Sequence, residues 1–344
     1  MIDFRYHLVS IVAVFLALTV GIVVGATAFR PTVENRLNDL AKRAIRADQA
    51  ANALNTKLQN QINADNVFGR AISGYALAHL LSGERVVLIT APDADGGTVT
   101  GITSALRQAG ATVTGQVSLA PAFFSTSRAR ESALSSLAAQ VTPVGIALPG
   151  PAPSGPDSGQ QAAARVLATG LMTRDGPVTV SSAQSQAILT GFSQQGYLQL
   201  AGSGHGPVPL AEQATMAVVV EPASVPTATG QAGSYGQALV WLTHDLQQAG
   251  LGAVLAGSVA GSGAGSAIDL VTGGNAPVVV STVDDADTAI GQILVAQALR
   301  HELDPHAAPG NYGAGTQAAP SPAPTSPPTP SPSPTPSARK RGHR

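Results

Sequence analysis

The side chains best suited to chemistry are aspartates that follow two apolar runs of the chain. They are Asp93, Asp95, Asp284, Asp285 and Asp287. In open α/β sheets, ligands bind beyond the carboxyl ends of the parallel strands, so carboxylates placed there could hold a hard cation. The alternative is helix capping, because an aspartate at a helix start accepts backbone N–H bonds and suits the helix dipole. We expect capping for most of them and retain Asp284, Asp285 and Asp287 as candidate metal ligands.

Two histidines near the end of the last predicted helix are the other candidate metal ligands. His301 and His306 lie on either side of Pro305, where that helix should end. Imidazole is a common metal ligand, but a single surface histidine usually binds nothing. We expect a metal site that is weak, shared between chains or absent from the folded domain.

Other chemical motifs are absent from the sequence. The chain has no cysteine and only three methionines, which excludes disulfides, thiolate ligands and cysteine nucleophiles. The glycine-rich stretch 257–265 lacks the third glycine of a dinucleotide-binding loop and the lysine of a P-loop. No Gly-x-Ser-x-Gly nucleophile elbow occurs either. The sequence predicts neither an enzyme nor a bound cofactor.

Alternating strands and helices must position these residues. Apolar runs predict strands, and segments that end in glycine predict the helices between them. The predicted strands are 85–90, 112–119, 144–148, 216–220 and 277–283, and the predicted helices include 99–108 and 285–302. Such alternation predicts a mostly parallel, Rossmann-like α/β sheet that is covered on both faces.

This α/β domain should occupy residues 71–310. The segment 106–113 is echoed at 246–254 and more faintly at 192–200, and each copy has the pattern of a helix end, a glycine cap and a strand. Pro/Gly-rich connections at 141–159 and 202–209 could divide the domain into two similar halves.

Residues 1–30 are predicted to form a single transmembrane anchor. Leu8–Phe29 carries no charge and would span roughly 33 Å as a helix, which matches the hydrocarbon core of a bilayer. A cleaved signal peptide is the alternative, since Ala26-Thr27-Ala28 resembles a signal peptidase site. The apolar run is longer than the core of a signal peptide, which favours an uncleaved anchor. Small residues recur at every fourth position from Ala13 to Gly25, a spacing that lets two such helices pack closely.

Residues 31–70 are predicted to form a coiled-coil stalk. Apolar residues alternate spacings of four and three along this stretch, as a heptad seam requires. They are Val33, Leu37, Leu40, Ala44, Ala47, Ala51, Leu54 and Leu58. The alternative is one amphipathic helix that packs on its own domain. Together with the small-residue seam, the heptads predict a homodimer or a higher homo-oligomer.

Residues 311–344 are predicted to be a disordered tail. Nine of the chain's 25 prolines lie between Ala319 and Ser337, among Ser, Thr and Ala, so this segment should be extended. It ends in Arg339-Lys-Arg-Gly-His-Arg344, a basic tip that is either solvated or in contact with anionic lipid or polymer.

Composition and charge limit the partners. The chain has 344 residues, and its formal charge of −1 offers no general attraction for nucleic acid. Basic residues are more numerous after the apolar helix than before it, which by the positive-inside rule would place the large domain in the cytoplasm. Long domains can be translocated regardless of such charge, and the Pro-rich tail favours an extracytoplasmic location.

The N-terminal block MIDFRYHLVSIVAVFLALTVGIVVG, the helix behind it and the Ala/Gly/Val-rich α/β region resemble the actinobacterial copper transporter family. The resemblance runs to about residue 301 and includes Ser281-Thr-Val-Asp-Asp285. It implies a single-pass envelope protein, anchored in the lipid bilayer, that takes part in copper efflux or copper homeostasis with copper as the transported ion. It supplies no set of copper ligands.

The expected function is therefore assistance to copper export. The alternative is a single-span coiled-coil scaffold that binds an envelope protein partner in envelope assembly or cell separation. A third hypothesis is a degenerate α/β enzyme or a small-ligand receptor, because such folds offer ligand sites at their strand ends.

Overall fold

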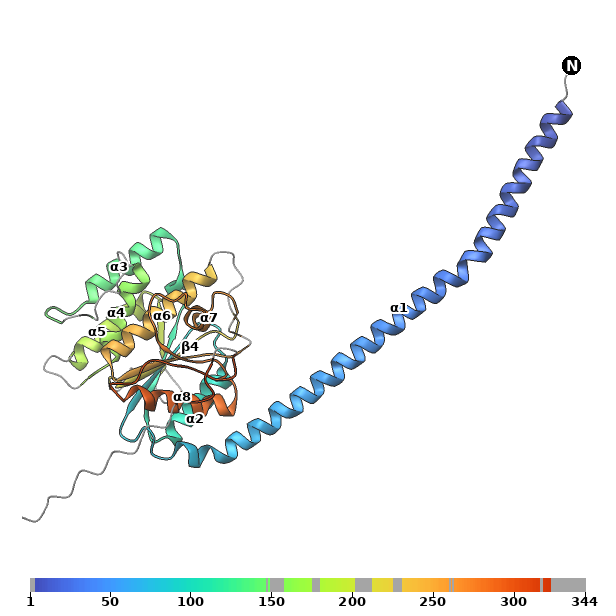
Figure 1. Ribbon diagram of the computed structural model, residues 1–344. Helices are drawn as coiled ribbons and strands as arrows, with labels where there is room; N and C mark the ends of the chain where they lie inside the picture. Colours follow the sequence, from blue (N-terminus) through green and yellow to red (C-terminus); the bar gives the residue numbers. More distant parts are fainter. Residues whose placement is uncertain are drawn as a thin grey trace, which may run out of the picture. The chain divides into compact units, whose positions relative to one another are not determined.

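The computed structural model describes residues 4–146, 148, 158–174, 180–201, 212–224, 231–259, 261, 263–315 and 318–322. The chain divides into two compact units between Ala64 and Asp65. The first unit is helical, and the second holds the strands of the described chain (Figure 1). The predicted tail from residue 323 onward lies outside the described residues.

Helix α1 (Phe4–Leu77) runs without a break through the predicted anchor and stalk. Its segment Tyr6–Ala26 is long and apolar enough to cross a membrane, and it is not buried. The heptad positions from Leu40 to Leu58 are exposed as well. An exposed apolar seam is compatible with a coiled coil. Pairing of this helix with a second copy stays a prediction.

The last turns of α1 belong to the α/β unit, which begins at Asp65 rather than at residue 71. The Asn66 Oδ1 atom accepts a 2.7 Å hydrogen bond from the backbone N of Ala289, so it satisfies a free N–H at the start of helix α8 (Ala289–Glu302). Gly69 approaches Ala289 so closely that an added Cβ would lie 3.0 Å from the Ala289 Cβ. Leu77, at the end of α1, is fully buried in the core.

The second unit is built on a seven-stranded sheet with the order β3-β2-β1-β4-β5-β6-β7. The strands are β1 (Arg85–Thr90), β2 (Thr112–Leu119), β3 (Leu198–Ala201), β4 (Met216–Val220), β5 (Gly252–Ala256), β6 (Ser281–Val283) and β7 (Asn311–Tyr312). Neighbouring strands are parallel except β2 and β3. The predicted mostly parallel α/β fold is confirmed, and it contains one sheet in one compact unit.

Helices cover both faces of this sheet (Figure 1). The described helices of the unit that follow α1 are α2 (Gly96–Gln108), a short 3-10 helix (Pro121–Phe124), α3 (Arg128–Val141), α4 (Gly159–Leu171), α5 (Ser182–Gln194), α6 (Gln231–Ala249), α7 (Ala267–Thr272) and α8. Side chains alternate along each strand, so Val87 and Ile89 join the core under α3 to α7, whereas Val86 and Leu88 join the core under α2 and α8. The central strand β4 is buried along its whole length.

Two predicted strands differ from the structure. The segment 144–148 has no strand among its described residues: Val144 is 99% exposed, and Gly145 turns the chain with a φ of 81°. Of the segment 277–283, only β6 is a strand, and Val279 is 65% exposed. A short apolar run does not by itself distinguish a strand from a loop.

The sheet also extends beyond residue 310, where the tail was expected to begin. Strand β7 pairs with β6, and Tyr312 is 5% exposed. The Asp284 carboxylate accepts hydrogen bonds from the backbone N atoms of Ala314 at 2.8 Å and Gly315 at 3.0 Å. These bonds attach residues 311–315 to the end of β6.

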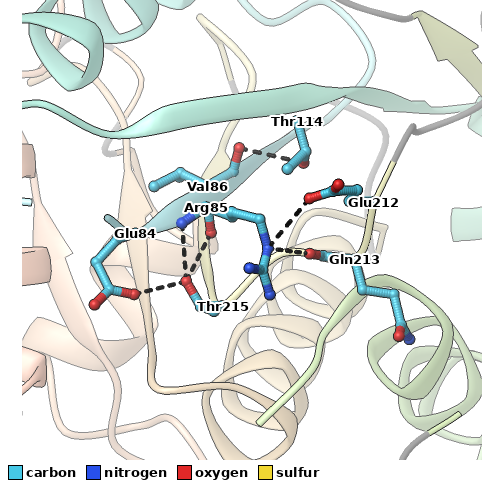
Figure 2. A network of polar contacts seen from close by, with 7 residues as sticks. All are labelled: Glu84, Arg85, Val86, Thr114, Glu212, Gln213 and Thr215. Atoms are coloured by element: carbon cyan, nitrogen blue, oxygen red, sulfur yellow. Dashed lines mark hydrogen bonds and ion pairs between the residues drawn. The ribbon is translucent and has the colours of Figure 1, made fainter. Parts of the chain in front are cut away.

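A polar network joins the amino ends of β1 and β4 (Figure 2). The Thr215 Oγ1 donates to Glu84 Oε2 at 2.7 Å and accepts from the backbone N of Arg85 at 3.0 Å. The Arg85 Nε donates to the backbone O of Gln213 at 2.9 Å and lies 3.9 Å from Glu212 Oε2. The network helps to fix β1 against β4 at their amino ends.

Candidate functional site

The sheet has a topological switch point between β1 and β4. The chain continues from β1 to β2 on one side of the sheet and from β4 to β5 on the other. Connections that leave two neighbouring strands in opposite directions open a crevice at their carboxyl ends, which is where such sheets bind ligands. The backbone N of Ala91 still donates to Val220 O, and that of Glu221 donates to Ala256 O, both at 2.9 Å.

A pocket of about 250 Å³ lies at this crevice, and we call it the switch-point pocket. Its lining residues include the acidic Asp95, Glu221 and Asp287 and the apolar Val220 and Pro222. A second hollow of about 600 Å³ lies between α2 and α8 and shares Asp95 and Asp287 with the first. The described lining of the switch-point pocket contains no lysine, arginine or histidine.

Glu221 is the most buried acidic side chain of this lining, with 2% of its surface exposed. Its Oε2 accepts a long hydrogen bond of 3.4 Å from the backbone N of Ile268, and its Oε1 has no partner among the described residues. Burial above all, with the negative charges of Asp269 and Asp284, raises the pKa of Glu221 to about 8. Gly257 makes room for this carboxylate, because an added Cβ there would overlap Oε1.

Asp95 caps helix α2, as the capping hypothesis expects. Its Oδ2 accepts hydrogen bonds from the backbone N of Thr98 at 2.6 Å and from the Thr98 hydroxyl at 2.9 Å. The backbone bond from Thr98 lowers the pKa of Asp95, so this carboxylate is ionised at neutral pH. Asp93 precedes it in a left-handed turn with a φ of 61°.

The three aspartates after β6 lie in different surroundings. Asp284 holds the backbone at Ala314 and Gly315, as described above. Asp285 is buried, its Oδ1 has no partner among the described residues, and burial, then Asp284, raises its pKa to about 6. Only Asp287 lines the switch-point pocket. None of them caps α8, since Thr288 occupies that position and its Oγ1 accepts from Gly291 N.

His301 and His306 lie at the other end of α8 from these aspartates. The 14 residues of that helix separate the two ends by roughly 20 Å. The His301 ring packs edge-on against Tyr312, with ring centroids 6.3 Å apart, and His306 is exposed. Among the described residues, no group of three or more His, Cys, Asp or Glu side chains is placed to hold a metal ion.

Sequence reasoning missed Glu221. The available signal was that Glu221 is an acidic residue directly after the apolar run 216–220. Asp284 follows β6 in the same way, and its position drew attention to it. The glycine-rich stretch 257–265 leads only into the six-residue helix α7, which is too short to act as the phosphate-binding helix of a nucleotide site.

Comparisons with known proteins find relatives over nearly the whole chain. Residues 1–322 match the family described as "Copper transport outer membrane protein, MctB". The copper transporters MctB of Mycobacterium bovis and Mycobacterium tuberculosis are each 31% identical over 323 residues, which cover 92% of this chain and 97% of theirs. The MctB of Mycobacterium leprae is 29% identical over 319 residues. The chain therefore belongs to the MctB family of copper transport proteins.

Proposed function

We propose that the protein is a membrane-anchored component of the cell envelope that assists copper efflux. The observation that carries the proposal is the family match over residues 1–322, which includes both the apolar helix and the α/β unit. The apolar, unburied helix Tyr6–Ala26 supports the anchor. In this proposal, the α/β unit lies outside the cytoplasm.

In this proposal, copper is the transported ion and not a bound cofactor. Soft Cu(I) prefers thiolate and thioether ligands, whereas the chain has no cysteine and the switch-point pocket offers carboxylate oxygens. Assistance to export therefore requires neither a tight copper site in the α/β unit nor an enzymatic step. We propose that the chain acts on copper export through its place in the envelope and through the assembly it forms there.

Deletion of the gene should raise cellular copper and lower the copper concentration that the cells tolerate, because export is slowed. Cellular copper content measures the first effect, and growth across a copper series measures the second. The full chain should restore both. A Leu16→Arg/Leu18→Arg chain should not, because each charge at the centre of a membrane helix costs about 3 kcal/mol of insertion free energy.

The matched control is Leu16→Ile/Leu18→Ile, which keeps the helix apolar and should restore copper tolerance. Normal copper content and normal tolerance in the deletion strain would contradict the proposal. If the charged variant fully restored copper tolerance, the membrane anchor would be contradicted, but the role in copper export would not.

A second candidate function is a scaffold that binds an envelope partner through its helix. The observation in its favour is the exposed apolar surface of α1 after the apolar segment, where Leu40, Leu54 and Leu58 are 47–60% exposed. Exposed leucines at heptad spacing favour pairing with another helix. This candidate requires self-association of α1, which cross-linking can measure.

A further inference from the structure

We infer that the last turns of α1 form a contact surface for a second copy of this chain, so that two copies meet at their α/β units as well as along their stalks. The surface, which we call the seam face, consists of Phe68, Ile72 and Tyr75 of α1, with Ile290 of α8 at its edge. All four residues belong to the α/β unit. The inference rests on the second proposed function, the scaffold, because it extends the helix pairing that a scaffold of this kind requires.

The first argument is the exposure of these apolar side chains. Phe68 is 62% exposed, Tyr75 94% and Ile72 38%. Ile290 continues the face onto α8, where it is 40% exposed, and its Cγ1 atom lies 3.2 Å from the place that a Cβ at Gly69 would occupy. Exposed apolar side chains that gather on one face mark an interaction site, whereas single ones need no explanation.

The second argument is spacing, which identifies the partner as a helix. Alternate steps of three and four residues extend the heptad seam from Leu58 to Gln61, Asp65, Phe68, Ile72 and Tyr75. Helix α1 runs without a break to Leu77, so these positions continue the same face of the helix. Apolar residues at such positions insert between the side chains of a facing helix. The seam face is thus the last part of the heptad seam.

The third argument is that the sides of the seam leave room for a second helix. The positions that flank it are occupied by small residues, namely Ala64, Gly69, Ala71, Ala76 and Ala78. After Asp65, the one charged side chain of α1 is Arg70, which lies about 160° around the helix from Phe68. The face opposite the seam is occupied, since Asn66 binds the start of α8 and Leu77 is in the core.

The fourth argument identifies the facing helix as the α1 helix of a second copy. Two copies anchored in one membrane by their amino-terminal segments run parallel, and parallel helices in register bring the same heptad positions together. In this arrangement, Arg43 of one copy faces Asp48 of the other across the edge of the seam, which pairs opposite charges. The seam face exposes only on the order of 300 Å² per copy, which is too little for a stable dimer by itself. It therefore needs the longer seam that a second α1 supplies.

The test is disulfide cross-linking of the full chain in membranes, where the lack of natural cysteines leaves no background. Phe68→Cys and Val67→Cys are a matched pair, because these neighbouring side chains are 62% and 65% exposed but lie about 100° apart around the helix. We expect Phe68→Cys and Tyr75→Cys to form disulfide-linked dimers with a yield within about twofold of that of Leu54→Cys. Val67→Cys should give a yield that is lower by about fivefold or more, because its thiols point away from the seam.

A second measurement needs no thiol. In a parallel pair, the two Asp65 carboxylates would meet at a seam position, where like charges oppose association. Asp65→Asn should therefore strengthen dimerisation of the full chain in detergent micelles several-fold, as measured by analytical ultracentrifugation. Tyr75→Glu should weaken it about tenfold, because it buries a charge in the interface, whereas Val67→Glu should change it little. All three side chains are exposed, so the variants should stay folded.

The outcomes separate this inference from the scaffold function. If Leu54→Cys cross-links but the two seam-face thiols cross-link no more than Val67→Cys, the inference is overturned and the scaffold function stands. If no position cross-links, both are contradicted. A dimer whose stability is the same in Asp65→Asn, Tyr75→Glu and the wild type would also overturn the inference.

Discussion

At the scale of single residues, Glu221 couples folding to pH. An unfolded glutamate has a pKa of about 4.5, and burial raises that of Glu221 to about 8 in the folded chain. Between these values, the unfolded state has lost the proton that the folded state keeps. The free energy of unfolding therefore falls as pH rises through this window, by up to about 1.4 kcal/mol per pH unit. The contribution is fully present below pH 4.5 and lost above pH 8.

Replacing this carboxyl by an amide should remove most of that pH dependence. Glu221→Gln should be more stable than the wild type at pH 9 by a few kcal/mol and nearly equal to it at pH 4.5. Urea unfolding at both pH values measures the difference, with Glu212→Gln as the exposed control. Asp285 adds a smaller effect of the same sign up to about pH 6, which both variants retain. Stability curves with the same pH slope in Glu221→Gln and wild type would contradict the prediction.

The sequence identifies acidic residues at strand ends but not their separate roles. The prediction of helix capping is confirmed for Asp95 and wrong for the aspartates after β6, because the hydroxyl of Thr288 takes the cap of α8. Asp287 lines the pocket, whereas Asp284 binds a segment that is some 30 residues further along the chain. Local spacing cannot reveal a partner at that distance in sequence.

At the scale of elements, β7 should contribute measurable stability. A chain that ends after Gly310 loses the burial of Tyr312 and leaves the Asp284 carboxylate without its donors at Ala314 and Gly315. We expect the free energy of unfolding to fall by roughly 3–5 kcal/mol. The matched control ends after Pro322 and keeps all these groups. Equal urea midpoints for the two truncated chains would show that β7 is dispensable.

Some strands and some helices could be predicted from the sequence, and others could not. Strands β1, β2 and β4 have the bounds that their apolar runs indicate, and β1 and β4 are almost entirely buried between two layers of helices. Helices α3 and α4 have no counterpart among the sequence predictions. Most of α4 is buried against α3, α5 and α6, and many of its buried side chains are small alanines, so the sequence offers no long apolar run that would mark it.

At the scale of the whole molecule, if the protein is a coiled-coil scaffold, the α1 helices of two copies should pair. The chain has no cysteine, so one introduced thiol reports contact without background. Leu54→Cys lies on the predicted seam and should form a disulfide-linked dimer in membranes under mild oxidation. Thr56→Cys lies about 200° around the helix and should not. Equal cross-linking at both positions, or none at either, would count against a coiled coil.

The attachment of β7 also sets a condition on how the protein is made. The chain grows from its amino end, so β6 and Asp284 emerge before the residues that satisfy them. The sheet cannot complete its edge until synthesis has passed Gly315. Folding of the α/β unit must therefore finish after its polypeptide is almost entirely assembled, and a nascent chain that is still short of Gly315 carries an incomplete sheet edge.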